Sequence, residues 1–168
     1  MKTKILTILA ILTFTISCKK EEKKILLPTK NIIVENINFQ LPKDFTENGI
    51  NKWKFLVDRK IAYIEISNSE MKDMNSALDD LKNKEMEKES SKYTLVDSKK
   101  GDTLNKKYII ENYKFNNNNQ IGGFPVYSYE TYSVIEFNNN ILGIHSFSLG
   151  FNLNDTMKKS IQNIKPNK

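Results

Sequence analysis

The sequence predicts an α+β domain in which an antiparallel sheet of about six to seven strands is layered with two helices. Two observations favour this class. Segments that alternate between apolar and polar residues recur along the chain with short polar turns between them, which is typical of antiparallel strands joined by hairpins. Two other segments repeat apolar residues every three or four positions, as one-sided helices do, and each needs a sheet face to cover.

The first part of the domain is expected to form three strands and a helix. One strand is predicted over 31–42 and ends at Pro42, which cannot donate a ladder hydrogen bond. Its inward set is Ile33, Ile37, Phe39 and Leu41. Two more strands are predicted over 52–57 and 61–67, on either side of the polar turn Asp58-Arg59-Lys60. The helix that follows repeats apolar residues at helical spacing, namely Met71, Met74, Leu78 and Leu81, with Asp73 or Asn75 as its N-cap.

The rest of the domain is expected to add four strands and a second helix. The predicted strands, in chain order, are 93–97, 106–115, 124–137 and 141–151. Turns are expected at 100–102 and 138–140, and the asparagine-rich segment 116–123 is expected to form a loop. A closing helix is marked by Leu153, Met157, Ile161 and Ile164. Asn154 or Asp155 is expected to cap this helix, and Pro166 lies beyond its end.

The first 17 residues have the pattern of a secretory signal peptide. Lys2 and Lys4 precede an apolar stretch over 5–16, and the small residue Ser17 follows it. The stretch is too short to span a bilayer, which takes roughly 20 residues, but it matches the roughly 7–15 residues of a signal peptide. Cys18, the only cysteine of the chain, comes directly afterwards.

The boundary at Cys18 resembles that of bacterial lipoproteins, because the run Lys19-Lys20-Glu21-Glu22-Lys23-Lys24 follows at once. In that family the cysteine thiol is lipidated with acyl chains such as palmitate, and the leader is removed just before it. The resemblance implies a signal peptide over 1–17, lipidated Cys18 with a flexible tether over 18–30, and a single domain over 31–168. The residues Thr15-Ile16-Ser17 depart from the usual family pattern, which leaves an ordinary secreted protein or a short membrane anchor as alternatives.

Composition argues against a nucleic-acid-binding role. Without the leader, 24 of the 26 basic residues remain against 20 acidic ones, a formal net charge of +4. Arg59 is the only arginine, and arginine supplies the planar donor fork that phosphate and base recognition favour. The lysine-rich surface is therefore interpreted as a source of solubility, with no nucleic-acid partner.

A second resemblance concerns the domain itself. The segment Asn38-Phe39-Gln40-Leu41-Pro42-Lys43-Asp44-Phe45 and the terminal helix Met157-Lys158-Lys159-Ser160-Ile161 after a long hairpin are similar to the PsbP-like family. The resemblance covers 31–165 and implies an α-β-α sandwich around an antiparallel sheet. It also implies a non-catalytic assembly, adaptor or binding role, often at membranes, but it identifies no binding residue in this chain.

No catalytic, metal or cofactor site is predicted. His145, the only histidine, lacks a nucleophile motif and is expected to be a strand residue with a hydrogen-bonded ring. Gly122-Gly123 lacks the lysine and the following helix of a phosphate loop. Lysines interleave an acidic cluster that we interpret as a solvated helix face: Asp79, Asp80, Glu85, Glu87 and Glu89.

Aromatic residues lie on both faces of the predicted strand over 124–137. Tyr127 and Tyr129 share one face, and Phe124 and Tyr132 share the other. Tyrosine is favoured at interfaces because it combines apolar area with a hydrogen-bonding tip. We expect Tyr127, Tyr129 and Tyr132 either to pack in the core of a central strand or to form an interaction surface.

These observations lead to the hypothesis of a lipid-anchored, non-enzymatic binding or adaptor protein of the bacterial cell envelope. Its expected partners are the membrane, through the anchor, and an envelope protein. The anchor is compatible with the outer membrane, on its periplasmic or its surface face. Two alternatives remain open: a hydrolase that acts on envelope glycans through a carboxylate pair, and a protective, immunity-type protein that binds a toxin.

Overall fold

The structure, a computed structural model, describes residues 26–57, 60–86, 93–103, 106–121, 124–137 and 139–166. Within these ranges the side chains of 116–121 and 124–126 are not described. The predicted signal peptide, Cys18, the first eight residues of the expected tether and Gly122-Gly123 lie outside the described residues.

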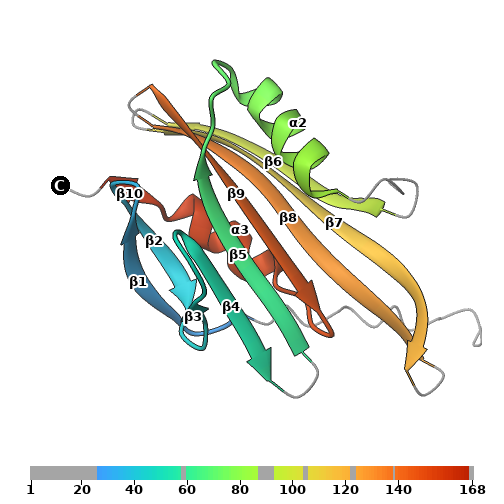
Figure 1. The fold of residues 1–168 in the computed structure, drawn as a ribbon. Helices are drawn as coiled ribbons and strands as arrows, with labels where there is room; N and C mark the ends of the chain where they lie inside the picture. Colours follow the sequence, from blue (N-terminus) through green and yellow to red (C-terminus); the bar gives the residue numbers. More distant parts are fainter. Residues whose placement is uncertain are drawn as a thin grey trace, which may run out of the picture.

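Two antiparallel sheets and two helices make up the described domain (Figure 1). The large sheet has seven strands in the order β3-β4-β5-β9-β8-β7-β6, and the small sheet has three in the order β1-β2-β10. The predicted α+β class is confirmed. The strands are β1 (Thr29–Val34), β2 (Ile37–Pro42), β3 (Thr46–Glu47), β4 (Lys52–Val57), β5 (Lys60–Asn68), β6 (Tyr93–Thr103), β7 (Lys106–Ile121), β8 (Phe124–Phe137), β9 (Asn140–Leu149) and β10 (Lys165–Pro166), and the helices are α2 (Met74–Glu85) and α3 (Asn154–Gln162).

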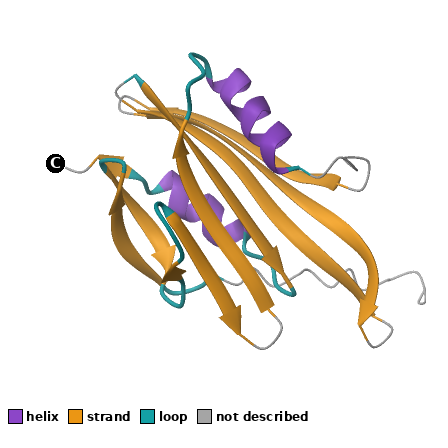
Figure 2. Ribbon diagram, viewed as in Figure 1, coloured by secondary structure: helices purple, strands orange, loops and turns teal. Residues whose placement is uncertain are grey.

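The two helices cover opposite faces of the large sheet (Figure 2). On one face α3 packs with strands of both sheets in the main core, and its Met157 and Ile161 are fully buried. On the other face Ala77 and Leu78 of α2 pack against Tyr132 of β8 in a smaller core. Because strand side chains alternate, odd-numbered residues of β8 face α3 and even-numbered residues face α2.

The prediction of one strand over 31–42 is wrong, because the segment is a hairpin of β1 and β2. Glu35 and Asn36 both have positive φ angles, 47° and 60°, as the favoured two-residue hairpin turns require. The turn pairs Val34 with Ile37, so both lie on the buried face. Ile33, which was expected on that face, is 63% exposed. β1 also begins at Thr29, two residues before the expected domain boundary.

The turn predicted at 100–102 is also wrong, since β6 continues to Thr103. Gly101 lies within the strand because the ring of Tyr108 on β7 fills the space beside it. A Cβ at position 101 would lie 2.2 Å from Cζ of Tyr108. The prediction of a loop over 116–123 is also wrong for most of that segment, because β7 continues to Ile121. This part of β7 pairs with β8, with a register shift after Asn117.

The predicted N-cap is confirmed for α2 and wrong for α3. Oδ1 of Asp73 accepts hydrogen bonds from the backbone N–H groups of Asn75 (3.1 Å) and Ser76 (2.9 Å), so Asp73 is the N-cap of α2 as predicted. Neither Asn154 nor Asp155 caps α3. The buried Leu153 takes the cap position without a side-chain hydrogen bond, and Oδ1 of Asn152 accepts from the N–H of Asn154 at 2.9 Å.

Candidate functional site

A cleft of about 670 Å³ opens on the α3 side of the large sheet. Its volume falls within the roughly 300–1,000 Å³ of small-molecule sites, which combine apolar walls with a few convergent polar groups. The lining comes from β2, β4, β5, β6, β7, β8, the start of α3 and the segments between elements. It consists of Leu27, Pro42, Asp44, Phe45, Phe55, Lys60, Val96, Asp97, Asn112, Tyr129, Phe151, Asn152, Asn154, Asp155 and Lys158.

Three phenylalanines form a continuous aromatic wall. The rings of Phe45 and Phe55 are stacked with centroids 5.8 Å apart, and Phe151 meets Phe55 edge to face at 5.6 Å. Phe45 is fully buried and anchors the wall to the main core, whereas Phe55 and Phe151 are half-buried. The wall therefore offers a ligand preformed apolar surface with an anchored ring behind it.

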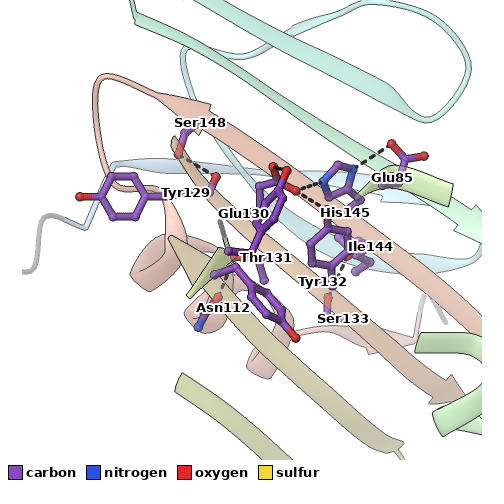
Figure 3. Close-up of polar contacts among 12 residues, drawn as sticks. Glu85, Asn112, Tyr129, Glu130, Thr131, Tyr132, Ser133, Ile144, His145 and Ser148 are labelled. Carbon is purple, nitrogen blue, oxygen red and sulfur yellow. Dashed lines mark hydrogen bonds and ion pairs between the residues drawn. The ribbon is translucent and has the colours of Figure 1, made fainter. Parts of the chain in front are cut away.

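Polar side chains hold one another in place elsewhere in the cleft. Nδ2 of Asn112 donates to Oδ1 of Asp97 at 2.5 Å. The Thr131 hydroxyl donates to Oδ1 of Asn112 at 2.7 Å (Figure 3). Lys158 of α3 forms an ion pair with Asp97. Thr131 also lies 3.2 Å from Oδ1 of Asn154, the buried first residue of α3. This network ties β6, β7, β8 and α3 together at the cleft.

A β-bulge in β6 turns a side chain toward the cleft. The register between β6 and β7 shifts between Leu95 and Asp97, so Val96 is the extra residue. Val96 is 55% exposed and lines the cleft, whereas Leu95, which is 50% exposed, does not.

The three tyrosines predicted from the sequence do not form one surface. Tyr129 is 8% exposed and lines the cleft. Tyr127 lies on the same face of β8 and is half-buried, with Nζ of Lys114 3.9 Å from its ring centroid. Tyr132 is fully buried on the opposite face, so its inclusion in an interaction surface is wrong. It contributes to the core under α2, which was the alternative left open by the sequence.

A buried polar network surrounds His145 on the α2 side of the sheet (Figure 3). Nε2 of His145 lies 3.3 Å from Oε2 of the buried Glu130, and Nδ1 lies 3.4 Å from Oε2 of Glu85. The hydroxyl of Tyr132 donates to Glu130, and that of Tyr93 donates to Oε1 of Glu130 at 3.1 Å. The Tyr132 ring stacks on His145 with centroids 4.6 Å apart.

The two carboxylates favour the charged form of the histidine. Burial alone lowers the pKa of His145, but its contacts with Glu130 and Glu85 outweigh burial and raise that pKa above its ordinary value. The contact with His145 lowers the pKa of Glu85. Burial, with the neighbouring Glu130, raises the pKa of the Tyr132 hydroxyl. The interpretation of His145 as a strand histidine with a hydrogen-bonded ring is confirmed, and it lies on the opposite face of the sheet from the cleft.

The acidic residues of α2 have two kinds of environment. Asp79 pairs with Lys82 at 3.1 Å and Asp80 with Lys84 at 2.6 Å, as on a solvated helix face. Glu85 instead contacts His145, and sequence spacing does not indicate this contact because the two residues lie 60 positions apart. Across the described residues, no three histidine, cysteine or acidic side chains gather in a way that would hold a metal ion. No helix in this part of the chain has the length and apolar character needed to cross a membrane.

Comparison with solved structures identifies the fold. No protein-family model matches the sequence, and no curated protein matches it. The Saccharomyces cerevisiae Ran-binding protein Mog1p superposes with a TM-score of 0.55 at 8% sequence identity, over 84% of this chain and 97% of Mog1p. A Pseudomonas aeruginosa protein of unknown function, PA94, aligns at 12% identity over 82% of this chain and 96% of its own, with a TM-score of 0.43. The Mog1p likeness shows a Mog1/PsbP fold, in agreement with the PsbP-like architecture expected from the sequence.

Proposed function

We propose that the protein is a lipid-anchored, non-enzymatic binding or adaptor protein of the bacterial cell envelope, and that its partner binds in the cleft beside Tyr129. The observation that carries the binding role is the cleft itself. It has the volume of a ligand site, an aromatic wall and a set of polar side chains held by mutual hydrogen bonds. Mog1p, which has the same fold, is a Ran-binding protein, and this favours a protein partner.

Two features support a role without catalysis. The only histidine of the chain is buried on the other side of the sheet, where a ligand in the cleft does not reach it. Asp97, a carboxylate of the cleft, is already engaged by Lys158 and Asn112. Neither His145 nor Asp97 is therefore free to act as a general base on a bound ligand, which leaves Asp44 and Asp155 as the other carboxylates that line the cleft.

The anchor is proposed from the sequence alone, on the apolar leader that ends at Cys18. Intact mass measurement of the processed protein tests it: we expect a chain that begins at Cys18 and carries acyl chains. A Cys18→Ser chain should keep the leader and lack the acyl mass. A processed protein with an unmodified Cys18 thiol would refute the anchor without affecting the cleft proposal.

Photo-crosslinking tests the cleft, because β6 offers a matched pair of positions. Val96 and Leu95 are neighbours with similar exposure, 55% and 50%, but only Val96 lines the cleft. We place benzoylphenylalanine at each position in turn and irradiate intact cells. The chain with the crosslinker at 96 should give a discrete adduct, and the chain with it at 95 should not.

The aromatic wall provides the second arm of this experiment. Phe151→Asp places a charge on the half-buried edge of the wall and should abolish the adduct formed at position 96. Ile50→Asp changes a residue that is 90% exposed and outside the cleft lining, so it should leave the adduct intact. Equal adducts from positions 95 and 96, or an adduct at 96 that survives Phe151→Asp, would contradict binding in the cleft.

A further inference from the structure

Exposed aliphatic side chains gather at the tip of the hairpin formed by β4 and β5. Leu56 is 60% exposed, Val57 is 50% exposed and Ile61 is 36% exposed. Leu56 pairs with Ile61 across the hairpin, and Val57 pairs with Lys60. We call Leu56, Val57 and Ile61 the apolar tip. By strand alternation Leu56 and Ile61 lie on one face of the hairpin and Val57 on the other. Single exposed aliphatic residues are common on protein surfaces, but three at the end of one hairpin suggest that something covers this end.

The N-terminal segment joins the domain at the same end. Leu27 lines the cleft together with Phe55 and Lys60, so the start of the described chain lies close to the β4–β5 hairpin. Leu26, the residue before it, is 51% exposed. Figure 1 shows the start of β1 and the β4–β5 hairpin at the lower end of the domain, away from the C-terminus. Cys18 lies nine residues before Leu27, and nine extended residues reach at most about 30 Å.

The opposite end of the domain carries a polar cluster. There the carboxylate of Glu35 accepts hydrogen bonds from Nδ2 of Asn51 at 2.6 Å and from Nδ2 of Asn68 at 2.9 Å. Asn68 ends β5, whose nine residues separate the two ends by about 30 Å. Ile50, in the turn before β4, is 90% exposed at that end, and Ile33 (63%) and Met71 (39%) are exposed there on separate segments of the chain. The tether joins the domain near the apolar tip. A short tether therefore brings the apolar tip to the membrane and keeps the end that carries Glu35 away from it.

We infer that the apolar tip rests on the bilayer surface when the chain is anchored, an inference that rests on the proposed lipidation of Cys18. In this position Leu56, Val57 and Ile61 enter the boundary between headgroups and acyl chains, where apolar area is removed from water. The opening of the cleft, which Leu27 and Lys60 line, then lies beside the membrane.

Apolar burial contributes more to this contact than charge does. Lys43 and Lys60 are exposed at the tether end, and neither has an ion-pair partner among the residues that the structure describes. Their long side chains reach lipid headgroups. Asp44 and Asp155 line the same cleft and offset the two lysines. The contact is therefore expected on phosphatidylcholine alone, without acidic lipid.

A tryptophan reporter tests the orientation independently of natural lipidation. In the mature chain over 18–168, Trp53→Phe removes the only tryptophan, and Val57→Trp places a new one on the apolar tip. Ile50→Trp is the matched control at the other end of β4. Each protein is coupled through Cys18, its only thiol, to a maleimide-bearing lipid in phosphatidylcholine vesicles with or without brominated acyl chains.

Bromine quenches tryptophan only at close range, so it reports contact with the bilayer. We expect brominated vesicles to lower the emission at position 57 by about twofold and to leave position 50 unchanged. Adding Leu56→Asp to the chain with the reporter at 57 should remove the quenching, and adding Ile50→Asp should not.

Two results would overturn the inference. Equal quenching at positions 57 and 50 would show that the anchored domain has no preferred face. A blue shift at 57 without bromine quenching would show that protein, such as a second copy of the chain, covers the tip. Because coupling to the vesicle is chemical, this outcome is separate from the mass measurement at Cys18, which decides the anchor itself.

Discussion

Replacing Glu130 by glutamine is expected to destabilise the protein by about 3 kcal/mol near pH 6. Glu130 is 5% exposed, accepts hydrogen bonds from Tyr93 and Tyr132, and lies 3.3 Å from Nε2 of His145. Glutamine keeps the shape of the side chain but turns an amide NH₂ group toward one of these donors. A lost hydrogen bond to a buried charged acceptor costs about 1.5–3 kcal/mol. Loss of the contact with charged His145 adds about 1–2 kcal/mol to the destabilisation. This cost is small for a buried charge because His145 can release its proton and become neutral.

The pH dependence identifies the histidine as the partner. Because the pKa of His145 is raised in the folded state, the stability it contributes is fully present below its unfolded pKa of about 6.5 and is lost as pH rises through the folded value. The Glu130→Gln protein retains only Glu85 beside the ring. The stability difference between the two proteins should therefore be largest at about pH 5–6 and narrow as pH increases. The lowered pKa of Glu85 acts in the opposite direction, because the stability that it contributes is lost as pH falls.

Urea denaturation followed by circular dichroism at several pH values measures this difference. Glu136→Gln is the matched control, because Glu136 lies on the same strand and face but is 31% exposed and pairs with Lys107 at 3.2 Å. Breaking that surface pair should cost less than about 1 kcal/mol. The reasoning would be refuted if Glu130→Gln cost no more than Glu136→Gln, or if its cost stayed constant or grew as pH rose.

Three further predictions concern stability and use the same urea assay. Gly101→Ala should destabilise by about 1–3 kcal/mol because a Cβ would meet the Tyr108 ring, and the cost should be smaller in a Tyr108→Ala background. Met157→Ala should cost about 2–5 kcal/mol by opening a cavity in the main core, whereas Lys159→Ala on the exposed side of α3 should stay within about 0.5 kcal/mol. Asp73→Ala should lower the urea concentration at the unfolding midpoint, because α2 loses its N-cap.

Much of the fold could be predicted because alternation and helical spacing are local signals. Strands β4, β5 and β8 lie where their apolar patterns place them, and both helices form there too, although Met71 precedes α2 and Ile164 follows α3. The hairpin at Glu35 and Asn36 was missed because the residues on both sides read as one alternating strand, and only the positive φ angles reveal the turn. Gly101 was misread as a turn residue because the ring that requires a glycine there belongs to Tyr108 on the next strand.

The site could be predicted only in part, because it depends on which face of β8 each residue takes and on distant partners. The sequence pointed to Tyr129, which lines the cleft, but it grouped this residue with the buried Tyr132 on the other face. The partners of His145 were not predictable, since Glu85 and Glu130 reach it from a helix and a neighbouring strand. No spacing rule connects such residues before the topology is known.

Three departures from local sequence rules lie at the cleft. Helix α3 begins with the buried Leu153 at its cap position, while Asn154, the expected cap, is buried beside Thr131 and lines the cleft. The β6 ladder is interrupted at Val96, whose side chain is exposed there. Asn112, an amide on a central strand, is buried among the polar groups of the same cleft. Because local rules are expected to fail where a sequence is shaped by function, these three exceptions at one place favour the cleft as the functional site.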